Sequence, residues 1–242
     1  MSTTNTIGNR INKLPEGYVF TYSDLIDDLG NKKEAVIKAL NRMASSGKIS
    51  KLTKGKYYKP EATIFGDLQP IQYQIVKDLL ENDGQVIGYL TGFSIYNKLG
   101  LTTQVSNVIQ IGKNDIRAQF KRERFTISFI RQKNSITKEA IPLLQILDAF
   151  RYIKKIPDTS VFLASKRLLA IVKELSESDK TRIVKLALKY PPATRALLGA
   201  ILEEIGEQEL AESLRKSLNP ITEYKLSGVG KAISSSTKWN IQ

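Results

Sequence analysis

Apolar residues recur at helical spacing three times within the first 46 residues, which predicts three helices in this part of the chain. The apolar face of the first helix consists of Ile7, Ile11 and Leu14. That of the second consists of Leu25, Ile26 and Leu29. Thr21 or Ser23 can cap the second helix, Gly30 ends it, and Asn31 can cap the third.

The third helix, over about residues 32–46, divides most clearly into two faces. Its apolar stripe consists of Val36, Ala39, Leu40 and Met43. The opposite face consists of Glu34, Lys38, Asn41 and Ser45, with Arg42 beside them. This polar face fits the major groove of DNA, where Asn pairs with adenine and Arg or Lys pairs with guanine or contacts phosphate.

Two short runs follow this helix, residues 48–52 and 57–60, and they flank a turn that contains Gly55. Alternating runs around a glycine turn predict a β-hairpin. A hairpin directly after the third helix is the wing of a winged helix. We therefore predict a winged helix-turn-helix domain over residues 1–66.

Charge makes DNA the expected partner of this domain. The 242 residues carry a net charge of +13, which favours polyanions, and nucleic acid first among them. Between Glu34 and Glu61 the chain has seven basic residues and no acidic one. A solvated face usually mixes charges of both signs, whereas contact with phosphates favours positive charge alone. A winged helix that serves only as a protein–protein module is the alternative.

The predicted DNA-binding residues come from the third helix and the wing. They are Lys38, Asn41, Arg42, Ser45, Lys48, Lys51, Lys54, Lys56 and Tyr57. Lys38, Asn41 and Arg42 are expected in the major groove. Lys51, Lys54 and Lys56 are expected to contact phosphates from the wing, with Tyr57 packed beside them.

Residues 67–137 predict a mixed α/β segment. A helix over about residues 70–80, with Ile71, Ile75, Leu79 and Leu80 on one side, is followed by a turn, a short helix and another turn over residues 88–101. The spacing of Gly88 and Gly92 matches no phosphate-binding loop, so turns are expected there. Strands are predicted over residues 105–112 and 125–131. The basic cluster between them consists of Arg117, Lys121, Arg122 and Arg124, and it could extend the DNA interface, bind an acidic partner or be a solvated strand end.

Residues 138–242 predict a helical bundle, and the whole chain is therefore expected to be α+β and mostly helical. Helices are predicted over about residues 141–153, 160–174, 177–190, 192–205 and 207–218. The last nine residues, 234–242, are the one stretch that resembles a disordered tail. An acidic surface is expected from Glu203, Glu204, Glu207, Glu209 and Glu212, and it is interpreted as solvated and not catalytic.

The chain contains neither cysteine nor histidine. Zinc fingers, thiolate nucleophiles and imidazole acid–base chemistry are therefore excluded. We expect no enzymatic activity, no cofactor and no metal. The apolar runs are too short to span a membrane, and no signal peptide is recognised, so the protein is expected in the cytoplasm and not in a membrane.

Motifs distributed along the chain resemble AbiEi-type antitoxins of bacterial type IV toxin–antitoxin (abortive infection) systems. The first motif runs from Val36 through Gly47 and Gly55 to Tyr57-Tyr58 and Pro60. The others are Thr91-Gly92, Leu99-Gly100-Leu101-Thr102-Thr103-Gln104, Ile153-Lys154-Lys155-Ile156-Pro157-Asp158 and Tyr190-Pro191-Pro192-Ala193-Thr194-Arg195-Ala196-Leu197-Leu198-Gly199-Ala200. The resemblance therefore extends over most of the chain.

This resemblance implies two roles. The winged helix would bind inverted repeats in the promoter of its own operon and repress transcription. The remainder, residues 67–242, would be an antitoxin domain that neutralises a cognate nucleotidyltransferase-like toxin. The resemblance gives no residues for a toxin site, and direct contact with the toxin is not implied. The alternative is a winged-helix regulator that has a ligand-binding or dimerisation domain in place of an antitoxin domain.

Overall fold

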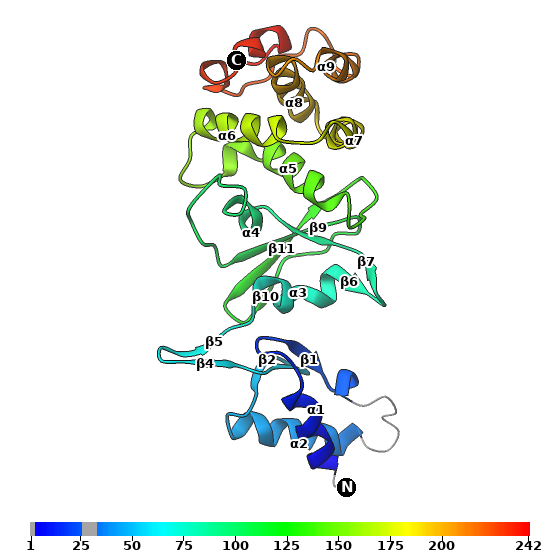
Figure 1. Cartoon of the computed structure of the whole chain (residues 1–242), viewed down its shortest axis with the longest axis vertical. Coiled ribbons are helices and arrows are strands. Elements are labelled where there is room, and N and C mark those ends of the chain that lie inside the picture. Colours follow the sequence, from blue (N-terminus) through cyan, green and yellow to red (C-terminus); the bar gives the residue numbers. More distant parts are fainter. Residues whose placement is uncertain (1–2, 26–32) are drawn as a thin grey trace. The chain divides into compact units, whose positions relative to one another are not determined.

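The computed structural model describes residues 3–25 and 33–242, and it has an α+β fold (Figure 1). The chain forms two compact units. The first comprises Met1–Asp78 and Lys121–Phe125, and the second comprises Leu79–Phe120 and Thr126–Gln242. The boundary expected after residue 66 thus lies inside the first unit, which continues for twelve more residues and includes a short segment from later in the chain.

The first unit begins with two helices and a small antiparallel sheet. Its elements are α1 (Thr3–Asn12), β1 (Val19–Thr21), the 3₁₀ turn η1 (Ser23–Leu25), α2 (Lys33–Ser45), β2 (Ser50–Thr53) and β3 (Lys56–Tyr58). The strand order is β1-β3-β2, with both pairs antiparallel. The predicted first helix, third helix and hairpin are therefore confirmed as α1, α2 and β2–β3.

Only the start of the predicted second helix lies within the described residues. It begins as η1, and Ile26, Leu29, Gly30 and Asn31 lie outside the described residues. The contact at its start differs from the expected cap. The Asp24 carboxylate accepts hydrogen bonds from the amide (2.7 Å) and the hydroxyl (2.9 Å) of Thr21.

The core of the first unit forms where α1 and α2 pack together. Ile7 and Ile11 of α1 are buried, as predicted. The predicted stripe of α2, formed by Val36, Ala39, Leu40 and Met43, is buried as well. Even the most exposed of the four, Met43, is only 8% exposed. Because the apolar face of α2 is turned into the core, its opposite, polar face lies on the outside of the unit.

A hairpin that the sequence did not indicate follows the sheet. It consists of β4 (Glu61–Thr63) and β5 (Gly66–Leu68), and Ile64 and Phe65 at its tip are both 94% exposed. The next helix, α3 (Gln72–Leu80), confirms the prediction and buries Ile75, Leu79 and Leu80. Ile71 was expected on the same buried side but is 69% exposed, because it precedes the first residue of the helix.

A four-stranded sheet, most of whose residues belong to the second unit, combines parallel and antiparallel neighbours. Its strand order is β10-β11-β9-β8, and these strands span Phe120–Arg122, Phe125–Arg131, Val108–Lys113 and Tyr89–Thr91. β9 and β11 were predicted and pair in parallel, whereas β8 pairs antiparallel with β9. β8 lies where a turn was expected, and its Tyr89 and Thr91 are buried. The expected short helix is α4 (Phe93–Tyr96), and the small hairpin β6 (Glu81–Asn82) and β7 (Gln85–Val86) follows α3.

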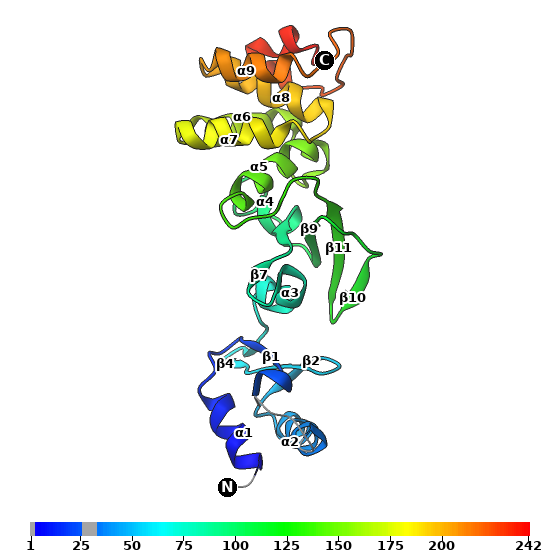
Figure 2. The ribbon, with the colours of Figure 1, turned by 90° about the vertical axis from the view of Figure 1, so that its right-hand side faces the viewer.

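The five predicted C-terminal helices are all present. They are α5 (Ile141–Arg151), α6 (Val161–Lys173), α7 (Glu177–Ala187), α8 (Pro192–Glu204) and α9 (Gln208–Arg215), with the 3₁₀ turn η3 (Ile153–Lys155) after α5. Figures 1 and 2 show α5 next to the sheet, α6 and α7 in a layer beyond it, and α8 and α9 in a further layer. One continuous hydrophobic core extends from Tyr89 to Ile241. Within the described residues, no helix has the length and apolar character that a membrane crossing requires.

The expectation of a disordered tail is wrong. Residues after the 3₁₀ turn η4 (Val229–Lys231) form a second turn, η5 (Ser234–Trp239), which packs on α8. Trp239 is 3% exposed, and its indole Nε1 donates to Glu203 Oε2 at 2.9 Å. A Cβ on Gly199 would lie 2.2 Å from the indole ring, so the absence of a side chain there makes room for Trp239.

Because Trp239 is buried against α8, removal of its indole ring should greatly reduce the stability of the fold. We expect Trp239→Ala to lower the free energy of unfolding by about 3–5 kcal/mol, because a cavity replaces a buried aromatic ring. Urea denaturation followed by circular dichroism measures the change. The exposed neighbour Thr237→Ala is the control and should change stability by no more than about 0.5 kcal/mol. A similarly small effect of Trp239→Ala would contradict the docked arrangement.

Candidate nucleic-acid interface

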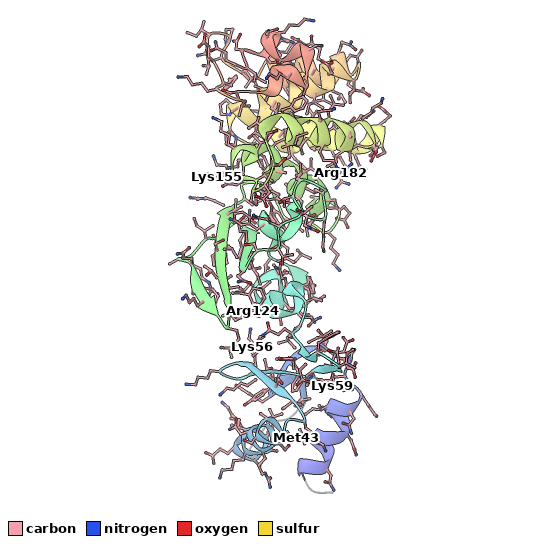
Figure 3. The ribbon with its side chains drawn as sticks, turned by 90° about the vertical axis from the view of Figure 1, so that its left-hand side faces the viewer. Met43, Lys56, Lys59, Arg124, Lys155 and Arg182 are labelled. Atoms are coloured by element: carbon pink, nitrogen blue, oxygen red, sulfur yellow. The ribbon has the colours of Figure 1, made fainter. Side chains whose placement is uncertain are left out.

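The outer face of α2 presents the polar residues that were predicted for the major groove. Lys38, Asn41, Arg42 and Ser45 are all exposed. In Figure 3 the labelled Met43 lies on the side of α2 that faces α1, and its Cε lies 3.5 Å from the position of a Cβ on Gly8. Because Met43 and the rest of the apolar stripe anchor α2, its four polar residues share one accessible surface.

Tyr57 has a different place from the one expected. Its side chain is 4% exposed and stacks near Phe20, with ring centroids 6.3 Å apart. β3 is the central strand of the sheet, so the side chain of Tyr57, which points toward the core, is covered. The Tyr57 hydroxyl donates to Asn41 Oδ1 at 3.0 Å. Tyr57 is therefore a support for Asn41. It lies opposite Lys51 across the sheet, but its ring is buried and does not form part of the exposed surface predicted to contact DNA.

The lysines of the wing fall into two groups. Lys48, Lys51 and Lys54 are exposed, as a role in phosphate contact requires. Lys56 is mostly covered, with 18% of its side chain exposed, and its Nζ lies 2.5 Å from Asp78 Oδ2 on α3. An ion pair already balances part of the charge of Lys56, which weakens the prediction that it contacts phosphate.

Asp78 also forms an ion pair with Arg122, one member of the basic cluster between Arg117 and Arg124. Arg122 is 8% exposed and makes a bidentate contact with Asp78, with N···O distances of 2.8 and 3.1 Å. Its guanidinium also donates to the main-chain oxygen of Ile75 at 2.5 Å. Arg122 is thus neither a solvated strand end nor an exposed DNA ligand.

The other members of that cluster remain at the surface. Arg117, Lys121 and Arg124 are exposed. The Arg117 guanidinium lies over the ring of Phe120 at 4.6 Å, and that of Arg124 lies over Phe125 at 5.0 Å. Stacking on aromatic faces orients these guanidinium groups without neutralising them.

Comparison with known proteins assigns most of the chain to one family. Residues 6–183 match the model of a family described as "Family of unknown function (DUF6088)". The chain belongs to this family. A search of curated proteins gives no match.

One solved structure shares the fold of this DUF6088 protein. It is described as the crystal structure of RV2827C protein from Mycobacterium tuberculosis, with a TM-score of 0.58 and 12% sequence identity. The match covers 94% of this chain and 86% of that chain. At this identity the likeness concerns the fold alone, so DNA binding and the antitoxin role stay predictions.

The acidic residues near α8 and α9 of the DUF6088 protein make structural contacts. Glu203 pairs with Arg215 (2.5 Å) and Lys238 (2.9 Å), and Glu207 pairs with Lys180 (2.7 Å). Glu204 accepts hydrogen bonds from the hydroxyl and the amide groups of the η5 segment. Within residues 3–25 and 33–242, no three acidic side chains gather in a way that would hold a metal ion.

The ion pairs of Asp78 generate a pH-dependent prediction. Burial acts to raise the pKa of Asp78, but hydrogen bonds from Arg122 and Lys56 outweigh it and lower the pKa below its ordinary value of 3.8. A carboxyl group with a lowered pKa stabilises the fold above its unfolded-state pKa, and this stabilisation is lost as the pH falls through the folded-state pKa. The contribution of Asp78 is therefore complete at neutral pH and disappears in acid.

We expect Asp78→Asn to lower the free energy of unfolding by about 1–3 kcal/mol at pH 7, because the buried Arg122 loses its charged partner. The difference from the unmodified protein should shrink below about pH 4. Urea denaturation at several pH values tests both statements. Asp67→Asn, at an exposed position on β5, is the control. Equal effects of the two substitutions at pH 7 would refute the assigned role of Asp78.

Proposed function

We propose that this DUF6088 protein binds double-stranded DNA through a winged helix-turn-helix over residues 1–66. The observation that carries the proposal is the combination of the exposed polar face of α2 with the exposed lysines of the β2–β3 hairpin, in a stretch that lacks acidic residues. The order of helices and strands in the first unit agrees with a winged helix. Binding, and not catalysis, is the role that these side chains suit.

The α2 face supplies groups that can read base edges. Arg42 and Lys38 suit guanine, and Ser45 can pair with either a donor or an acceptor. Asn41 can pair with adenine through its amide. The hydrogen bond from Tyr57 occupies one lone pair of Asn41 Oδ1 and fixes the orientation of the amide, and the second lone pair stays usable.

The wing supplies contacts that do not depend on base sequence. Lys51 and Lys54 lie on and next to strand β2, and Lys48 precedes it. Lysine contacts to phosphate provide affinity and make it fall with salt, because each contact releases counterions from the DNA. Lys56 is expected to contribute less than Lys51 or Lys54, since Asp78 neutralises part of its charge.

A double substitution in the wing tests DNA binding. We expect Lys51→Ala/Lys54→Ala to weaken binding to all duplex sequences and to reduce the slope of log K against log [salt] by about 0.9 for each lost contact. Fluorescence anisotropy with labelled promoter and scrambled duplexes, from low to high salt, measures both quantities. Lys173→Ala/Lys185→Ala removes the same charge from exposed positions in the second unit and is the matched control. An unchanged slope in the wing variant would remove the wing from the interface.

We further propose that the protein represses its own operon from inverted repeats and acts as the antitoxin of a nucleotidyltransferase-like toxin. The motifs shared with AbiEi-type antitoxins support this role, and they include residues of α4, η3 and α8 as well as the α2–β3 region. The second unit, which contains the large hydrophobic cluster from Tyr89 to Ile241, would then be the antitoxin domain. Both roles would be exercised in the cytoplasm, where DNA and toxin are accessible.

Co-expression tests the antitoxin role separately from DNA binding. Expression of a neighbouring nucleotidyltransferase gene should arrest growth, and expression of the full chain should restore it. We expect the Lys51→Ala/Lys54→Ala variant to restore growth equally well when it is produced from an unrelated promoter. Failure of the unmodified chain to restore growth would favour the alternative, a winged-helix regulator without a toxin.

A further inference from the structure

A basic pocket of about 540 Å³ lies within the second unit, apart from the residues assigned to DNA. The end of β11, the end of α5, the turn between α7 and α8, and α8 itself contribute to it. Five cationic side chains line it, and no carboxylate does. They are Arg131, Lys133, Arg151, Lys189 and Arg195.

The five cations are not held in ion pairs, although the buried Asp148 attracts Arg151 from beyond ion-pair distance. None of them forms an ion pair with the residues that the structure describes, whereas Lys180, Arg215 and Lys238 in the same unit do. Cations that converge without counter-charges repel one another, so the arrangement costs stability unless an anion binds among them. An anion bound among the five side chains would offset this repulsion.

Several groups of the pocket are held in place by contacts behind it. Arg151 Nη1 donates to the main-chain oxygen of Arg131 at 3.3 Å, and Arg195 Nη1 donates to that of Ser217 at 2.8 Å. The Arg195 Nε is buried and has no hydrogen-bond partner among the described residues. Guanidinium groups fixed in this way present their remaining donors in the fork geometry that phosphate oxygens match.

The inner wall of the pocket is part of a buried hydrogen-bond network. The Tyr190 hydroxyl donates to Asp148 Oδ1 at 2.9 Å, and Gln132 Nε2 donates to both the Tyr190 and the Tyr89 hydroxyl groups at 2.8 Å. Asp148 is 1% exposed and does not line the pocket. The network fixes Tyr190 and Gln132, so the pocket keeps its shape without a ligand.

We propose that this pocket binds a small ligand that carries several phosphate groups. The volume lies within the range of small-molecule sites, which is roughly 300–1,000 Å³. The cations suit two or more phosphates, and Leu188, Pro191 and Pro192 supply an apolar side. Nucleoside triphosphates and inorganic tripolyphosphate share this chemistry. The site goes beyond the proposed DNA binding and the antitoxin role, and it does not depend on either.

Isothermal titration calorimetry on the full chain tests the site, with ATP, GTP, inorganic tripolyphosphate and guanosine as probes and no added divalent metal. At least one phosphorylated probe should bind, and guanosine should not. Stronger binding of a nucleotide than of tripolyphosphate would show that the apolar side holds a base. Equal binding would show that the phosphates alone are recognised.

Pocket variants decide whether binding occurs at this place. We expect Lys133→Ala/Lys189→Ala, at two exposed positions, to weaken binding at least tenfold without changing the thermal midpoint of unfolding. Lys173→Ala/Lys185→Ala should bind as the unmodified chain does. The Lys51→Ala/Lys54→Ala variant should also keep its affinity, which separates this site from the DNA interface. Absence of binding by every phosphorylated probe, equal affinity in the pocket variant, or an effect of the pocket variant on duplex DNA alone would overturn the proposal.

Discussion

Repulsion between like charges is the constraint that organises this molecule. With a net charge of +13, the chain has too few carboxylates to balance all of its cations. The position of each carboxylate therefore decides which cations are balanced. Asp78 balances Lys56 and Arg122, Glu203 balances Arg215 and Lys238, and the pair Glu177 and Glu207 balances Lys180. Of these paired cations, Lys56, Arg122 and Lys180 are also largely covered. Other cations, among them Lys38, Lys51, Lys54 and those around the pocket, form no ion pair with the residues that the structure describes, and the proposed anion sites consist of such side chains.

Sequence patterns predicted the elements that depend on local periodicity. The stripe from Val36 to Met43 is a helical repeat, and it is buried as expected. Elements that depend on long-range contacts were missed or misplaced. β8 has only three residues and is specified by pairing with β9, and Trp239 docks because Gly199, forty residues earlier, leaves room for its ring. Neither contact can be predicted from the pattern of neighbouring residues in the sequence.

The same distinction applies to the candidate interface. Exposure of Lys38, Asn41 and Arg42 follows from helix periodicity and was predictable. The burial of Tyr57 was not, because it depends on β3 becoming the central strand between β1 and β2. Lys56 looked equivalent to Lys54 in the sequence, and only the approach of Asp78 on α3 distinguishes them. The pocket, which combines residues from four elements, had no signal in the sequence beyond the general excess of positive charge.

The first unit is discontinuous, since the chain leaves it after Asp78 and returns for residues Lys121–Phe125. Arg122 in the returning segment forms its bidentate pair with Asp78, so this unit closes only after an excursion of about forty residues into the second unit. Closing such a loop costs conformational entropy and raises the contact order, which slows folding. A fragment cut at residue 66 would therefore lack both the carboxylate beside Lys56 and the helix that carries it. The shortest fragment that contains the whole first unit is longer than the winged-helix pattern suggests.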